Sequence, residues 1–167
     1  MSLSIFNARL LDPASGLDEI GGILIEDGFI TAISPGATGA VGNANEVIDA
    51  GGLCLAPGLI DLRVKTGEPG DEQKETLATA SRAAVAGGVT SLVVMPDTKP
   101  VVDDVALVRY ISDRAKVSAK ARIYAAGALT VGLEGHAMAE IGMMADAGAV
   151  LFTNGDAPIA NPSILKR

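Results

Sequence analysis

The sequence lacks several residues on which common protein functions depend. Its 167 residues contain no tryptophan, one cysteine and one histidine, and only 3% of them are aromatic. A single cysteine excludes an internal disulfide, and Cys54, with leucine on both sides, is expected to be a small core residue rather than a nucleophile. No partner that would orient His136 as a general base is visible, so an ordinary polar residue is expected there.

Clusters of positive charge and long apolar runs are also missing. The formal net charge is −7 and the isoelectric point is near 4.6, which argues against binding to nucleic-acid phosphates. No run approaches the roughly 18 apolar residues of a membrane span. The first residues lack the basic region and apolar run of a secretion signal. We therefore expect a cytoplasmic protein that binds neither nucleic acid nor membrane.

What the sequence does contain indicates an α/β protein. Hydrophobic residues make up 49% and there are 20 glycines, so the core is built from small aliphatic side chains with many tight connections. The first 55 residues favour β structure: a strand over residues 4–11, a hairpin over 22–33 that turns at Asp27-Gly28, a loop over 35–45, and a strand over 46–49. This predicts a small β-rich segment over residues 1–55.

From residue 56 onward strands alternate with helices. Strands are expected over residues 59–64, 89–95, 121–126 and 149–153, and helices over 72–86, 103–117 and 138–147. The first helix should end at Gly87-Gly88, and the third should pack Met138, Met143 and Met144 into the core. Strands that alternate with helices of this length predict parallel βαβ units.

Residues 56–167 are too few for a closed β/α barrel, which needs roughly 250 residues. They suffice for the first three to four β/α units, so we expect a fragment of a longer barrel protein that stops near Arg167. The exposed edge of its last strand would then have to be covered, for example by a second fragment or a neighbouring chain. A small open α/β sheet is the alternative.

Several motifs follow one another in the order and spacing of a known family. Residues 56–62 (APGLIDL) resemble the entry to the first barrel strand of cyclic amidohydrolases. Residues 68–70 (EPG), 83–90 (AAVAGGVT) and 95–101 (MPDTKPV) are similar to the dihydroorotase branch, as are 127–130 (GALT), 132–135 (GLEG) and 145–150 (ADAGAV). The resemblance implies the N-terminal part of a TIM-like (β/α)8 metallo-dependent hydrolase barrel, preceded by a small β-sandwich segment.

The resemblance also implies where a zinc site would lie, and two residues there are unsuitable. The family's His-x-His pair at the end of the first barrel strand aligns with Arg63 and Lys65. Residues two apart on a strand face the same way, so two histidines there can hold one metal ion. A guanidinium cannot lose its proton and lysine is normally charged, so this pair would repel a metal cation.

Further positions depart from the family pattern. An arginine that meets the substrate carboxylate in relatives is replaced by Gly67, and an asparagine in Met-Pro-Asn-Thr is replaced by Asp97. At the end of the fourth strand the metal-ligand slot falls on Asn154, with Asp156 displaced. For Arg63 and Lys65 we favour ion pairs with Asp61, Asp97 or Asp156 over a new anion site. No metal or other cofactor is therefore expected, although active relatives bind zinc.

These features lead to one main expectation and two alternatives. The main one is a catalytically inactive dihydroorotase-family protein of pyrimidine biosynthesis that acts as a structural partner of aspartate carbamoyltransferase. The resemblance alone implies that partner, and a homo-oligomer is also expected. The first alternative is an active dihydroorotase that interconverts carbamoyl aspartate and dihydroorotate with an atypical metal site. The second is a hydrolase of another cyclic ureide.

Overall fold

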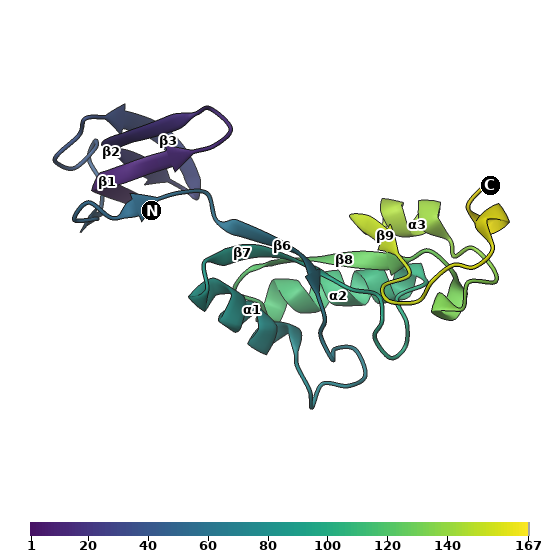
Figure 1. Ribbon diagram of the computed structural model, residues 1–167. Helices are drawn as coiled ribbons and strands as arrows, with labels where there is room; N and C mark the ends of the chain where they lie inside the picture. The colour runs from purple at the N-terminus through teal and green to yellow at the C-terminus, as the bar shows by residue number, and fades with distance from the viewer. Residues whose placement is uncertain (167) are drawn as a thin grey trace. The chain divides into compact units, whose positions relative to one another are not determined.

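A computed structural model describes residues 1–166, and the chain end that the sequence drew attention to, Arg167, lies outside the described residues. The chain divides into two compact units, Met1–Pro57 and a second unit that begins at Gly58 (Figure 1). None of the helices among the described residues is long and apolar enough to cross a membrane.

The first unit is a five-stranded sheet. Its strands are β1 (Ser2–Asp12), β2 (Leu17–Glu26), β3 (Phe29–Pro35), β4 (Glu46–Asp49) and β5 (Cys54–Leu55). The order is β3-β2-β1-β4, and β5 also pairs with β1. The predicted hairpin is confirmed, because β2 and β3 pair antiparallel across the turn at Asp27-Gly28, where both residues have positive φ. A small core of Ala8, Leu10 and Ile23 lies on one face of the sheet.

The expectation that Cys54 belongs to the core is wrong, because its side chain is exposed. The reason lies in the register of β5, which pairs Cys54 with Arg9 of β1. Paired residues on neighbouring strands project from the same face of a sheet. Cys54 therefore shares the outward face of the exposed Arg9 side chain, a placement that its apolar neighbours in sequence do not reveal.

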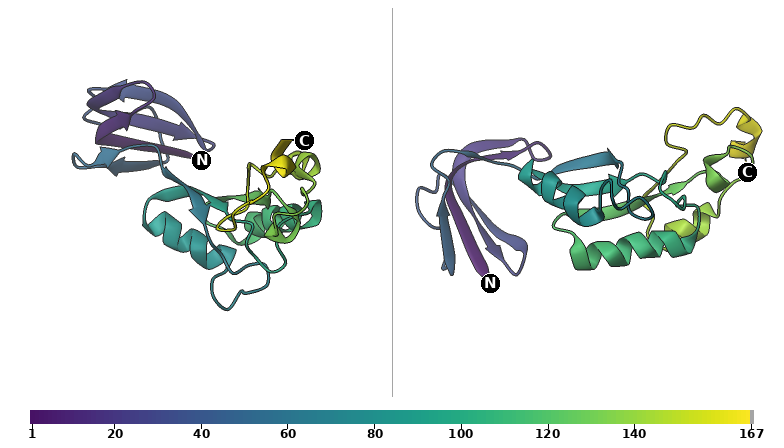
Figure 2. Two further views of the ribbon diagram at one scale, coloured as in Figure 1. Left: turned by 45° about the vertical axis from the view of Figure 1, so that its right-hand side comes forward. Right: turned by 90° about the horizontal axis from the view of Figure 1, so that it is seen from below.

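The second unit is a curled parallel sheet with crossover helices. Its elements are β6 (Leu59–Val64), α1 (Leu77–Ala86), β7 (Val89–Val94), α2 (Val105–Ser118), β8 (Arg122–Ala128), η1 (Val131–Leu133), α3 (Ile141–Asp146), β9 (Leu151–Thr153) and η2 (Pro162–Lys166). The strand order β6-β7-β8-β9 follows the sequence, and all three pairings are parallel. The α/β barrel architecture is thus confirmed as a four-stranded part of a barrel (Figure 2).

The three helices pack against one face of this sheet. A single apolar cluster joins Leu77 of α1, Ile111 of α2 and Met144 of α3 to Val94 of β7, and all four side chains are fully buried. The opposite face carries a smaller cluster formed by Val93, Met95 and Ala126. Neighbouring residues such as Val93 and Val94 point to opposite faces of a strand, so both faces of the central strands are apolar, as in a buried parallel sheet.

Two helices are shorter than the sequence predicts. The first begins at Leu77 rather than near residue 72, because Thr76 caps it and residues 66–76 form a loop. The third covers only Ile141–Asp146, since the preceding segment bends at Gly132 and Met138 pairs with Thr130 outside any helix. Met143 is 58% exposed, so its predicted core position is wrong, whereas Met144 is buried. The predicted helix end at Gly87-Gly88 is confirmed.

Candidate functional site

Four charged side chains meet at the carboxyl ends of three strands. Arg63 lies near the end of β6 and Lys65 just beyond it, Asp97 follows β7, and Asp156 follows β9. The Lys65 ammonium lies 2.7 Å from Asp97 Oδ2 and 2.6 Å from Asp156 Oδ2. The Arg63 guanidinium contacts the other oxygen of Asp156. We call these four residues the strand-end charge cluster.

Mutual attraction favours the ionised forms of Lys65 and Asp156. The hydrogen bonds that Lys65 donates to Asp156 and Asp97 raise the pKa of its ammonium group. The hydrogen bond from Lys65, with the charges of Lys65 and Arg63, lowers the pKa of the Asp156 carboxyl group. Both shifts favour the charged forms at neutral pH. Two positive and two negative charges therefore balance each other at this point.

The residues of the cluster do not fit a catalytic metal ion. A zinc site needs three or more ligand atoms with free lone pairs, but Arg63 and Lys65 offer only donor hydrogens. The carboxylate oxygens that could act as ligands already accept hydrogen bonds from these cations. Among residues 1–166 no group of three or more histidine, cysteine, aspartate or glutamate side chains is placed to hold a metal ion.

Gly67 lies at the centre of a tightly folded loop after β6. Its N–H donates to Glu75 O at 2.8 Å, and its own carbonyl accepts from Asp71 N at 2.6 Å. A Cβ atom at this position would lie 1.9 Å from the carbonyl oxygen of Asp71. The loop thus has no room for any side chain at residue 67, and the arginine that the family resemblance implies there would require a different loop.

Gly67→Ala is therefore expected to destabilise the second unit by about 1–3 kcal/mol, the usual cost of forcing an extra carbon into a packed position. The measurement is urea unfolding followed by far-UV circular dichroism. Gly142→Ala is the matched control, since nothing lies within 4 Å of its Cβ position in α3; there alanine should be neutral or stabilising by about 0.5–1 kcal/mol. Equal stability of Gly67→Ala and the unmodified chain would contradict the steric argument.

Ion pairs hold the same loop against the loop that follows β7. Asp71 lies 2.8 Å from Lys74 Nζ and 3.2 Å from Lys99 Nζ, and these lysines lower the pKa of its carboxyl group to about 2. The N–H of Lys99 also donates to Pro69 O at 3.1 Å. Between the two loops lies a cavity of about 240 Å³, lined in part by Lys65, Gly67 and Asp97.

Glu68 anchors the loop after β6 to α1 and α2. Its side chain is only 2% exposed, and its carboxylate accepts hydrogen bonds from Leu77 N at 2.8 Å, Arg114 Nε at 2.7 Å and Tyr110 Oη at 3.3 Å. Burial alone would raise the pKa of this carboxyl group, but the bonds from Leu77 and Arg114 outweigh it and the pKa is lowered. One carboxylate thus joins the loop to the start of α1 and to α2.

The hydrogen bonds of Asn154 lead to the loop after β8 and not to the strand-end charge cluster. It is 5% exposed, and its amide oxygen accepts hydrogen bonds from the backbone N–H and the hydroxyl group of Thr130. Its amide nitrogen donates to Leu133 O at 3.3 Å. These bonds join the end of β9 to the loop after β8, so Asn154 has a structural role here.

The structure therefore unites four of the six residues selected from the sequence: Arg63, Lys65, Asp97 and Asp156. Asp61, an anticipated partner for the cations, instead accepts a hydrogen bond from the backbone N–H of Arg63. The anchoring role of Glu68 was not predicted from the sequence. Its position in the Glu-Pro-Gly motif was a signal, but two of its three partners, Tyr110 and Arg114, lie more than 40 residues away in α2. His136 is exposed, and no hydrogen bond orients its ring among the described residues.

Comparisons with known proteins agree with the motifs. The sequence model of the family described as "Dihydro-orotase-like" matches residues 52–166. A dihydroorotase from Pelobacter propionicus is 41% identical over all 167 residues, and a dihydroorotase-like protein from Pseudomonas putida is 45% identical over the same length. This chain spans 39% of the length of each, or about two fifths.

Solved structures show the same architecture. The L-hydantoinase (dihydropyrimidinase) of Arthrobacter aurescens matches 90% of this chain and 32% of its own with a TM-score of 0.73 and 30% identity. An enamidase of the amidohydrolase superfamily matches 98% of this chain and 45% of its own with a TM-score of 0.65. At 24% identity the enamidase supports the fold alone.

Proposed function

Because this chain belongs to the dihydro-orotase-like family, we propose that it forms part of a catalytically inactive member of that family. In this proposal the protein works in pyrimidine biosynthesis in the cytoplasm, as a homo-oligomer that serves as a structural partner of aspartate carbamoyltransferase. The chain contributes the small β unit and the first strands of the barrel, and its residues take no part in metal-assisted hydrolysis.

The strand-end charge cluster carries this proposal. Metal-assisted hydrolysis needs a cation that lowers the pKa of bound water and polarises the scissile carbonyl. Where the family resemblance puts two histidines, this chain has Arg63 and Lys65, whose positive charges are balanced by Asp97 and Asp156. A carboxylate at Asp97 also offers no N–H donor where the family resemblance puts a substrate-binding amide, and its pairing with Lys65 leaves that cation engaged rather than free for an anionic substrate. Both requirements of the reaction, metal and substrate, are thus unmet by these residues.

The partner is proposed from the family resemblance. Two Pseudomonas relatives, each 45% identical over the whole chain, carry the name dihydroorotase-like protein. A scaffold that keeps the strands and turns of the family while its chemical positions differ fits a protein retained for its surfaces rather than for its site.

The experiment is co-purification of the protein from its complete gene with the aspartate carbamoyltransferase of the same organism. We expect one complex on a sizing column and a changed transcarbamoylase activity on mixing. Clean separation of the two proteins, with unchanged transcarbamoylase activity, would disprove the structural partnership.

An active dihydroorotase with an atypical metal site is the second candidate, since a relative that is 41% identical is named dihydroorotase. Zinc analysis and a carbamoyl aspartate cyclisation assay on the same preparation distinguish the active enzyme from the inactive structural partner. Stoichiometric zinc with turnover favours the enzyme. Absence of both, beside a stable complex with aspartate carbamoyltransferase, favours the inactive partner.

A further inference from the structure

The first half of β8 has a strand neighbour on one side only. Residues 122–125 pair with β7, but the ladder between β8 and β9 includes only Ala126, Gly127 and Ala128. The last contact before the ladder ends is the hydrogen bond from Val150 N to Ala125 O, at 3.1 Å. Beyond it, towards the start of β8, β9 is too short to cover the edge.

The backbone groups of Ile123 point to this uncovered edge. In a parallel ladder the N–H and C=O of one residue point to the same side, and the side alternates from residue to residue. The carbonyl of Ala125 points towards β9, so the N–H and C=O of Ile123, two residues earlier, point the same way. Within residues 1–166 no strand pairs with them there. Unpaired backbone groups at the edge of a sheet can bond to another strand.

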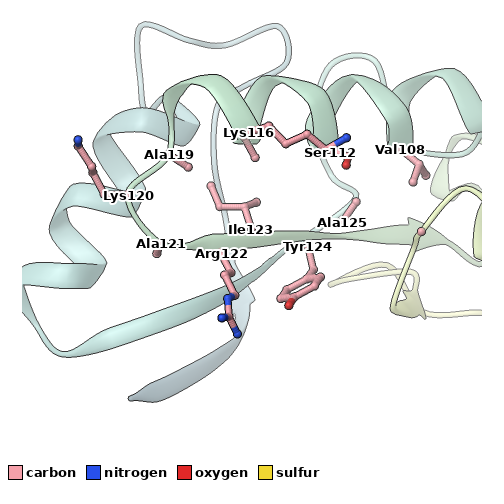
Figure 3. A pocket seen from close by; sticks show the side chains of 12 residues that line it. Val108, Ser112, Lys116, Ala119, Lys120, Ala121, Arg122, Ile123, Tyr124 and Ala125 are labelled. Atoms are coloured by element: carbon pink, nitrogen blue, oxygen red, sulfur yellow. The ribbon is translucent and has the colours of Figure 1, made fainter. Parts of the chain in front are cut away.

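A cavity of about 540 Å³ extends along this edge. In Figure 3, Ile123 and Ala125 project towards α2, whereas Arg122 and Tyr124 project from the opposite face of β8. The part of the cavity formed by α2 includes the buried side chains of Val108 and Ala115. A strand laid beside β8 would therefore place alternate side chains against the largely apolar α2 side of the cavity, where Lys116 also lies, and beside Arg122 on the opposite face of β8.

The charges around the cavity beside β8 determine which kind of partner strand can bind there. Residues 109–122 contain five arginine or lysine residues and one aspartate, in a chain of net charge −7. Three of the cations, Lys116, Lys120 and Arg122, line the cavity. A helix cannot use the edge, because its own N–H and C=O groups are bonded internally.

We propose that the free edge of β8 at Ile123 accepts an extended segment of a partner protein in which small apolar residues alternate with acidic residues. The partner strand bonds to Ile123 through its backbone, its apolar side chains lie against α2, and its carboxylates lie beside Arg122. Main-chain hydrogen bonds supply affinity and the alternating side chains supply selectivity, as in other cases of strand addition. The proposal is independent of the proposed function.

The test uses the protein from its complete gene and two acetylated octapeptides, one of alternating valine and glutamate and one of alternating valine and lysine. Nuclear magnetic resonance of the labelled chain should show the glutamate peptide slowing hydrogen exchange at the Ile123 amide and shifting the signals of Arg122 and Tyr124. We expect it to bind about tenfold more tightly than the lysine peptide, a ratio that a few exposed ion pairs can supply.

Two variants examine the two parts of the proposal. Arg122→Glu should reverse the preference between the peptides, whereas Arg109→Glu, the same charge change on α2 outside the cavity, should not. Ile123→Pro removes the N–H at the free edge, where proline is tolerated, and should abolish binding. A glutamate peptide N-methylated at alternate residues gives the same information without altering the chain, and it too should fail to bind.

Three results would overturn the proposal: no change at Ile123 with either peptide, equal binding of the two peptides, or undiminished binding of the N-methylated peptide. Protection of Ile123 that depends on the concentration of the chain alone would assign the edge to a second copy, and would also overturn the assignment to an acidic partner segment.

Discussion

The double variant Arg63→His/Lys65→His is expected to bind about one zinc ion per chain, whereas we expect the unmodified residues to bind none. The present side chains of both residues contact Asp156, so a modest shift of the loop after β9 towards the end of β6 would bring the two shorter imidazole side chains and one carboxylate together. Three protein ligands of this kind, with water as the fourth, are typical of catalytic zinc sites. Zinc affinity increases because the two substitutions together remove two positive charges and supply two neutral imidazole nitrogens as metal ligands.

Metal content after dialysis, measured by atomic emission, checks this expectation, and thermal unfolding with and without a chelator gives a second readout. The control is Arg63→Gln/Lys65→Gln, which removes the same charges without supplying imidazole nitrogens. Equal zinc content in the histidine and glutamine variants would show that the strand ends do not form the ligand geometry described above.

The second large effect is expected at Glu68. Glu68→Ala should lower the free energy of unfolding of the second unit by about 2–3 kcal/mol, because Leu77 N loses its buried acceptor and the bonds from Arg114 and Tyr110 are lost with it. Arg114 is half exposed, so its freed charge is solvated and the loss stays below the roughly 3–5 kcal/mol of a fully buried broken pair.

Urea unfolding by circular dichroism provides the measurement, and the exposed Glu140→Gln change serves as the control, with an expected effect within about 0.5 kcal/mol. The free energy of unfolding of Glu68→Gln should lie between those of Glu68→Ala and Glu140→Gln, since an amide oxygen can still accept the hydrogen bond from Leu77 N. If Glu68→Ala proves as stable as the control, the carboxylate does not anchor the loop.

The sequence predicted the strands better than the lengths of the helices. Apolar runs such as residues 92–95 mark buried parallel strands because both faces of the sheet need apolar side chains. The start of the first helix differs from the prediction because residues 72–76 have helical composition but are held in the loop by Glu68 and by the contacts of Gly67. The loop has no helical or strand periodicity that a local pattern could reveal, and Glu68 is itself fixed by Arg114, 46 residues away in α2.

The same limit applies to the candidate site. Arg63 and Lys65 could be selected because they stand two apart where a motif needs histidines. The sequence narrowed the expected ion-pair partners of Arg63 and Lys65 to three aspartates, but it could not show which of the three they contact. The choice of Asp97 and Asp156 over Asp61 depends on how the loops after β7 and β9 fold back over the strand ends. Asn154 was assigned to the site on motif position, whereas its hydrogen bonds to Thr130 commit it to the loop after β8.

The strand-end charge cluster also determines how many substitutions a metal site at this place requires. Replacing Arg63 alone with histidine leaves the Lys65 ammonium between the two carboxylates, and replacing Lys65 alone leaves the Arg63 guanidinium on Asp156. Neither single substitution provides the three protein ligands that a catalytic zinc ion needs. The two positions are therefore coupled, and zinc affinity should appear only in the double variant, as a non-additive effect of the two changes.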